Sequence, residues 1–217
     1  MEIHVSKITE WKRADVATCI VVPQRTSAGA SPLIDKAIEP IVAAARDRGA
    51  FKGKAGESLY LPLGNTDPVG ILLIGIGDDA DVDHEKIRRA AGKAISSLQN
   101  YRVTRLAIDC TVLWPVTAFI EGIVLGQYRF DRYKSPDPEC FTGTIDDIVL
   151  AAEKNSALTG DLEDCRYVAR VCENTNWARD IANALGGFTA TDDYLESDQY
   201  VVTWAVGHLL ELLEPEE

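Results

Sequence analysis

The sequence predicts an α/β sandwich, in which helices cover a β-sheet, and three observations support this. Apolar strand-like runs alternate with amphipathic helical segments over roughly the first 150 residues, the pattern of helices packed on a sheet. The chain has 217 residues, 46% of them hydrophobic, which is enough for a substantial core. No stretch reaches the ~18 consecutive apolar residues of a membrane span.

The predicted strands are short runs rich in β-branched and aliphatic residues. They are residues 16–23, 58–64, 70–77, 104–110 and 145–152. Three helices are predicted between them, at residues 32–49, 83–100 and 115–130.

The helix at 83–100 has the clearest pattern. Its apolar residues recur at spacings of three and four, which gives one stripe to lay against a sheet. Asp81 and Asp83 precede the stripe, where an acidic side chain caps the first turn and interacts favourably with the helix dipole. The stripe consists of Ile87, Ala90, Ala91, Ala94, Ile95 and Leu98.

A longer helix is predicted after the last strand, at residues 161–187, with Gly186 and Gly187 as its stop. A polar turn at 189–199 follows. The apolar run at 200–213 then reads as a strand over its first half and is ambiguous beyond it.

The charge of the chain is strongly acidic. It has 22 basic and 34 acidic side chains, a net charge of −12, which disfavours a nucleic-acid surface built from bulk charge. Residues 186–217 contain eight acids and no Lys or Arg, and they therefore carry −8. These acids are Asp192, Asp193, Glu196, Asp198, Glu211, Glu214, Glu216 and Glu217.

The cysteines are odd in number and scattered, without a Cys-x-x-Cys pair, and we interpret them as reduced thiols in a cytoplasmic protein. Residues 1–13 lack the apolar core of a signal peptide, and the sequence therefore predicts neither secretion nor membrane insertion. The five cysteines are Cys19, Cys110, Cys140, Cys165 and Cys172.

The loop after the strand at 70–77 is a candidate ligand site. Gly75 and Gly77 form a Gly-x-Gly turn between a strand and a helix, where α/β proteins often bind phosphate, and Asp78 follows. The third glycine of the dinucleotide fingerprint is replaced by Ala80, and an aspartate-rich loop repels anions. A strand-to-helix turn with capping aspartates is therefore the favoured interpretation.

Other short motifs point to structure rather than chemistry. A calcium loop counted from Asp79 would place His84 and Ala90 where Gly and Glu are required. Residues 65–67, Asn-Thr-Asp, resemble a turn between two strands. His4, His84 and His208 are far apart in sequence, and none has a second ligand at metal-binding spacing.

Three ordered blocks carry a family resemblance: residues 51–63, 69–94 and 118–135. Together they resemble the N-terminal domain of the leucyl aminopeptidase family, over roughly residues 1–180. The stretch Glu-Asn-Thr-Asn-Trp-Ala-Arg-Asp-Ile-Ala-Asn, 173–183, is similar to that family's linker helix. The resemblance implies a macro-domain-like three-layer α/β/α sandwich with a mixed sheet, a linker helix and a short extension.

The same resemblance implies where catalysis would occur. In the family, a separate catalytic domain holds two divalent metals, zinc or manganese, on lysine, aspartate and glutamate ligands, with an Asn-Thr-Asp-Ala-Glu-Gly-Arg signature. Nothing after residue 180 matches it, and residues 65–67 lack the continuation. We therefore expect no catalytic residue and no cofactor on this chain.

The C-terminal stretch resembles a different family. Residues 178–188 and 192–217 look like the opening of the Toprim domain of a bacterial type IA DNA topoisomerase, of the topoisomerase III kind. In that family a Glu precedes this helix in an Ala-Glu-Lys-Pro-Ser-type segment, and a later Asp-x-Asp pair holds magnesium. Glu173 stands at the matching offset as a candidate metal ligand, without the Lys-Pro-Ser context, and the Asp pair would lie beyond Glu217. An ordinary acid on the helix surface is the favoured interpretation of Glu173.

These expectations define a domain layout and a function. We expect an aminopeptidase-type N-terminal domain at 1–160, a linker helix at 161–187 and a truncated Toprim-like extension at 188–217. The expected function is non-catalytic, in assembly or partner binding, as a homo-oligomer or with a catalytic-domain partner, without nucleic acid or membrane. The alternatives are a module that binds nucleotides such as ADP-ribose, and a fragment of a type IA topoisomerase fusion.

Overall fold

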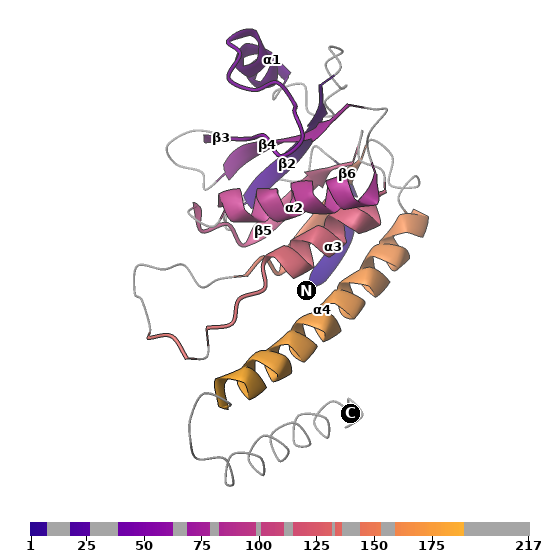
Figure 1. Cartoon of the computed structure of the whole chain (residues 1–217). Helices are drawn as coiled ribbons and strands as arrows, with labels where there is room; N and C mark the ends of the chain where they lie inside the picture. The colour runs from indigo at the N-terminus through magenta and orange to yellow at the C-terminus, as the bar shows by residue number, and fades with distance from the viewer. Residues whose placement is uncertain are drawn as a thin grey trace. The chain divides into compact units, whose positions relative to one another are not determined.

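The described residues form a mixed six-stranded sheet with helices on both faces (Figure 1). The structure is a computed structural model. It describes residues 1–7, 18–26, 39–62, 69–78, 83–98, 101–110, 115–131, 133–135, 144–152 and 159–188.

The strand order in the sheet is β1-β6-β5-β2-β4-β3. Among the described strands, only the β3–β4 pair is antiparallel, and the other neighbours are parallel. The α/β fold expected from the sequence is therefore confirmed. The strands are β1 (Glu2–Lys7), β2 (Thr18–Arg25), β3 (Ser58–Pro62), β4 (Val69–Gly77), β5 (Arg105–Asp109) and β6 (Asp147–Ala152).

The central strands are apolar on both faces because both faces are covered. In β2, Cys19 and Val21 belong to one core cluster, while Ile20 and Val22 belong to a second cluster on the opposite face. This explains why strands in the middle of the sheet read as continuous apolar runs rather than as alternating patterns. Helix α1 (Glu39–Asp47) contributes to the second cluster, and α2 (His84–Leu98) and α3 (Val116–Gly126) contribute to the first.

Helix α2 forms as its sequence pattern predicts. All six residues of the predicted stripe are buried. Asp83 caps the helix, because its side-chain oxygen accepts a hydrogen bond of 2.7 Å from the backbone N–H of Lys86. Asp81 lies outside the described residues.

Helices α2 and α3 pack closely because glycine lies between them. A Cβ atom added at Gly122 would lie 2.3 Å from the carbonyl oxygen of Arg88 and 2.6 Å from Cβ of Ala91. At the rim of this contact, Arg88 donates a hydrogen bond of 2.8 Å to Glu121. The two helices are thus in van der Waals contact at the backbone of α3, and an ion pair joins their exposed edges.

The edge strand β1 was missed by the sequence prediction. It pairs in parallel with β6, and its residue Ile3 is buried in the core. An ion-pair cluster joins this edge to β5: Arg105 is 2.5 Å from Asp147, whose other carboxylate oxygen is 3.5 Å from Nε2 of His4. Since the Arg105 side chain is only 6% exposed, the Asp147 carboxylate compensates a charge that is largely removed from water.

Two helix boundaries differ from the sequence prediction. The helix expected at 115–130 ends at Gly126: its last turn closes with the hydrogen bond from the backbone N–H of Gln127 to the carbonyl of Ile123, and residues 128–130 are not helical. The helix expected at 32–49 is α1, which covers Glu39–Asp47, and residues 32–38 lie outside the described part of the chain.

Helix α4 spans Thr159–Phe188, so the long helix predicted at 161–187 is confirmed. The chain divides into two compact units, and this helix belongs to both. In the first unit, Met1–Tyr128 and Ser135–Cys172, α4 buries Cys165, Ala169 and Cys172 in the core. The predicted extension at 188–217 lies outside the described residues, apart from Phe188.

The second unit comprises Arg129–Lys134 and Glu173–Glu217. In its described part, the rings of Phe130 and Tyr133 meet edge to face at 5.5 Å, and Asp131 pairs with Lys134 at 2.7 Å. These contacts shape the short connection after α3 into a compact turn.

Four of the five cysteines are described, and all four are free thiols. Burial raises the pKa of Cys19 far above its ordinary value, and it raises the pKa of Cys165 to about 12. Cys140 lies outside the described residues. The thiols of Cys19 and Cys165 are therefore neutral and act as packing residues.

None of the helices in the described part of the chain combines the length and apolar character that crossing a membrane requires.

Candidate functional site

The Gly-x-Gly turn at the end of β4 is the first candidate site, and the structure shows how its backbone is used. The N–H of Gly75 donates to the carbonyl of Glu57 at 2.7 Å, and the N–H of Gly77 donates to the carbonyl of Gly53 at 3.1 Å. A phosphate-binding turn needs such N–H groups directed at the ligand. Here both of them close the chain onto the 53–57 turn.

The need for glycine at these positions has a steric cause. A Cβ atom at Gly75 would lie 1.9 Å from the carbonyl oxygen of Lys54, and Gly77 has a φ of +87°. The approaching turn is itself fixed, because the Glu57 carboxylate accepts hydrogen bonds from the N–H groups of Lys52 and Lys54, at 2.9 and 3.1 Å. The glycines therefore allow two backbone segments to touch.

The acidic part of the same loop is only partly described. Asp78 is exposed, and residues 79–82 lie outside the described residues. On the far side of that gap, the Asp83 side chain occupies a donor group at the start of α2. The Asp83 carboxylate thus takes one of the N–H groups that an anionic ligand at this helix terminus would use.

The second candidate, Glu173, lies on α4 and is exposed. Among the described residues, no group of three or more His, Cys, Asp or Glu side chains is placed to hold a metal ion. His4 lies beside Asp147, and His84 is the first residue of α2. The structure therefore does not bring Glu173 together with the predicted turn or with either histidine into one ligand set.

Two features named from the sequence cannot be placed. Residues 65–67, the Asn-Thr-Asp triplet, and His208 both lie outside the described residues. The strands that flank the triplet, β3 and β4, pair antiparallel as the turn interpretation requires.

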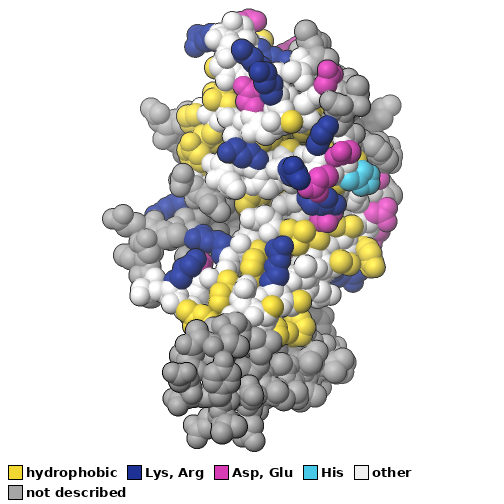
Figure 2. Space-filling view, in the orientation of Figure 1, with side chains coloured by type: hydrophobic (Ala, Val, Ile, Leu, Met, Phe, Trp, Pro, Cys, Tyr) yellow, Lys and Arg dark blue, Asp and Glu magenta, His cyan; other side chains and the backbone are white. Residues whose placement is uncertain are grey.

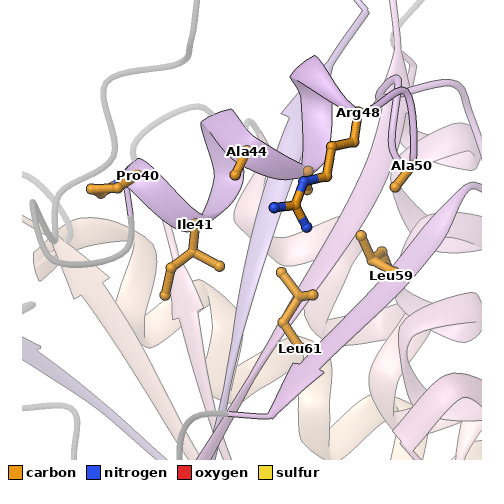
Figure 3. A pocket seen from close by; sticks show the side chains of 8 residues that line it. Pro40, Ile41, Ala44, Arg48, Ala50, Leu59 and Leu61 are labelled. Carbon is orange, nitrogen blue, oxygen red and sulfur yellow. The ribbon is translucent and has the colours of Figure 1, made fainter.

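The structure reveals an apolar groove between α1 and the edge strand β3, which the sequence did not identify (Figure 3). Its volume is about 430 Å³, within the range of ligand-binding clefts. We call it the α1–β3 groove. It is lined by Pro40, Ile41, Ala44, Ala45, Arg48, Ala50, Leu59 and Leu61.

The alternation of strand β3 explains why leucines reach the groove. Leu59 and Leu61 face α1, whereas Ser58 and Tyr60 point to the opposite face of the sheet. There the Tyr60 ring stacks on Tyr101, with ring centroids 3.7 Å apart. Neighbouring side chains of a strand alternate between faces. Tyr60 therefore packs on one face of β3, and Leu59 and Leu61 lie half-buried on the other.

Arg48 supplies the charge in this groove. Figure 3 shows its side chain extending from the end of α1 into the space above Leu61. In the part of the chain that the structure describes, its guanidinium has no ion-pair partner. The sequence signal was present as Ile41, Ala44 and Arg48 at spacings of three and four, but nothing in it showed that β3 lies beside them.

The opposite side of the sheet has a different surface. Figure 2 shows side chains of both signs lying next to one another over α2 and α3. On α2, Glu85 pairs with both Arg89 and Arg88, and these two arginines lower the pKa of the Glu85 carboxyl through hydrogen bonds. Charges paired in this way do not add up to a field of one sign.

Comparison with known proteins identifies the family. Residues 20–137 match the model of the cytosol aminopeptidase family, N-terminal domain. A "Probable cytosol aminopeptidase" of Geobacter sp. (strain M21) is 29% identical over 167 residues, which cover 75% of this chain and 33% of the relative. A "Probable cytosol aminopeptidase" of Roseiflexus castenholzii (strain DSM 13941 / HLO8) is 33% identical over 163 residues, covering 70% and 31%.

Solved structures agree at the level of the fold. A tomato leucine aminopeptidase variant superposes with a TM-score of 0.63 at 16% identity, covering 83% of this chain and 37% of that one. The bottromycin maturation enzyme BotP in complex with Mn gives 0.51 at 22% identity, covering 79% and 32%. The chain spans about a third of the length of the curated relatives it matches. The chain belongs to the cytosol aminopeptidase family and carries the family's N-terminal domain.

Proposed function

We propose that this chain is a non-catalytic domain of a metal-dependent aminopeptidase, serving assembly or partner binding. The observation that carries the proposal is the match of residues 20–137 to the family's N-terminal domain.

We further propose that two divalent metals, zinc or manganese, act in a catalytic domain outside the described residues. A bound metal would supply an activated water for peptide hydrolysis. The described residues do not fit such a site, since they offer no cluster of three carboxylate, histidine or cysteine side chains. No step of hydrolysis is therefore assigned to this chain.

The proposed organisation follows the domain layout expected from the sequence: a domain at 1–160, a linker helix at 161–187 and an extension at 188–217. In this layout, α4 passes from the core of the first unit into the second. We propose a homo-oligomer or a complex with a catalytic domain, in the cytoplasm. The names of the relatives, cytosol aminopeptidases, support the proposed location.

Because residues 178–217 resemble a topoisomerase Toprim domain, we propose that they derive from such a domain. Glu173 is the only candidate metal ligand in this proposal. The charge of −8 on residues 186–217 opposes DNA binding. The nucleotide-binding alternative has less support, because the N–H groups of Gly75 and Gly77 already donate within the chain.

An activity assay tests the non-catalytic proposal. The purified chain, supplied with Mn²⁺ or Zn²⁺, is expected to hydrolyse leucine p-nitroanilide no faster than buffer, because it lacks a fitted metal site among its described residues. A full-length relative, assayed in parallel, controls for the substrate and the metal. A metal-dependent rate that rises in proportion to chain concentration and persists through further purification would contradict the proposal.

A further inference from the structure

The α1–β3 groove lies beside an edge of β3 with which no strand of the described residues pairs. Strand β3 is last in the sheet order, so β4 occupies one of its edges. In the described part of the chain no strand pairs with its other edge. Backbone N–H and C=O groups along an open edge are a template on which an extended peptide can add a strand.

The groove chemistry specifies what such a peptide must carry. Side chains of an added strand alternate between faces, as those of β3 do, and every second one would enter the groove beside Leu59 and Leu61. The wall opposite them is Ile41 and Ala44 of α1, so aliphatic side chains fit. The guanidinium of Arg48 above these apolar walls favours a carboxylate, because it has no ion-pair partner among the described residues.

We propose that the α1–β3 groove binds an extended peptide segment of a partner protein that carries alternating aliphatic side chains and a carboxylate. The peptide backbone pairs with the free edge of β3, the aliphatic side chains pack between α1 and β3, and the carboxylate pairs with Arg48. This inference deepens the proposed partner-binding role and names the chemistry of the partner.

Selection from a library of phage-displayed random heptapeptides on the immobilised full chain provides the probe. Selected sequences, synthesised with a fluorescein label, are titrated by fluorescence anisotropy. We expect the selected peptides to carry Val, Ile or Leu at alternate positions and an Asp or Glu close to them. Methylation of backbone nitrogens should weaken binding at every second position of the peptide, because only alternate N–H groups face β3 in a strand pair.

Three variants locate the binding surface. Leu61→Asp places a charge on the apolar wall, and Ala44→Glu narrows the groove and puts a carboxylate one helical turn from Arg48. Each should reduce affinity by about tenfold or more. Arg48→Gln should reduce it by about threefold to tenfold and abolish the preference for Asp or Glu over Asn or Gln. Circular dichroism confirms that each variant is folded.

Matched controls lie on α4, away from the groove residues in sequence. Tyr167→Asp changes a side chain that is 62% exposed, and Arg170→Gln removes an exposed charge, so both should leave binding unchanged. The proposal is overturned if no peptide is enriched, or if peptides bind Leu61→Asp and Ala44→Glu as tightly as the original chain. It is also overturned if N-methylation has no effect at any position.

The alternative occupant is a second copy of this chain. If Leu61→Asp lowers the oligomeric mass and the original chain binds no peptide, the groove is a self-association surface and the peptide proposal fails. If no peptide binds and no variant changes the oligomeric mass, the proposal that the groove binds a partner is wrong. The proposed assembly role then still stands.

Discussion

Replacement of Gly122 by Val is expected to lower the free energy of unfolding by about 3 kcal/mol, the upper part of the usual range for overpacked cores. The first added carbon would lie 2.3 Å from the Arg88 carbonyl oxygen and 2.6 Å from Cβ of Ala91. Because the nearest atom belongs to the backbone of α2, a side-chain rotation cannot relieve the clash. The helices would have to separate, which would expose apolar area between them.

Gly92→Ala is the matched control, on the partner helix of the same pair. A Cβ atom at Gly92 has nothing within 4 Å, so this substitution should be neutral or stabilising by up to about 1 kcal/mol through helix propensity. Urea denaturation followed by circular dichroism measures both variants. Equal stability of Gly122→Val and the original chain would show that α2 and α3 are not in backbone contact.

Removal of the Asp147 carboxylate, by Asp147→Ala, is expected to cost about 3 kcal/mol, the lower end for a broken buried ion pair. It would leave the Arg105 guanidinium, whose side chain is 6% exposed, without its carboxylate. His4, which is 40% exposed, lies beside the same carboxylate and cannot replace it, since its charge is also positive when protonated. The cost is thus mainly that of an uncompensated buried charge.

A double variant separates this explanation from a loss of packing. Asp147→Ala combined with Arg105→Met should recover much of the stability, because the buried charge is then gone. Glu163→Ala is the control at an exposed pair, where Arg166 and Glu163 are 46% and 75% exposed, and it should change stability by less than about 0.5 kcal/mol. If the double variant is no more stable than Asp147→Ala, the buried-charge account is wrong. Urea denaturation provides all four values.

The elements with strong local patterns were predictable from sequence. Helix α2 shows a stripe of three-and-four spacing that coincides with its buried face. Strand β4 lies between β2 and β3 in the sheet, is buried throughout its middle, and reads as a continuous apolar run. In both cases, the residues that the local pattern marks as apolar are the residues that the fold buries.

The elements that sequence reasoning missed depend on distant contacts. Strand β1 has two apolar residues, Ile3 and Val5, in six, and its place is set by pairing with β6. The last residue of α3, Gly126, also meets a segment distant in sequence, since an added Cβ there would lie 3.1 Å from Cα of Gly92. Ile3 and Val5 alternate with polar residues, but two apolar positions are too few to identify a strand.

The candidate site shows the same division. The sequence located the Gly75 and Gly77 turn at the strand end, and it could not show that the 53–57 turn takes both N–H groups. It also could not bring Arg48 beside Leu59 and Leu61, because a helix and an edge strand must first fold together. Local patterns give the position of a turn, and tertiary structure determines which of its groups remain available for a ligand.

Native mass spectrometry tests the central claim, that this chain is an assembly domain rather than an enzyme. The chain is measured alone and mixed with a separately purified catalytic domain of the Geobacter relative. We expect the chain alone to show masses of two or more copies of 23.7 kDa, or the mixed sample to show a complex of the chain with the catalytic domain. A single 23.7 kDa species in both samples, at concentrations of about 10 μM where weak interfaces are occupied, would contradict it.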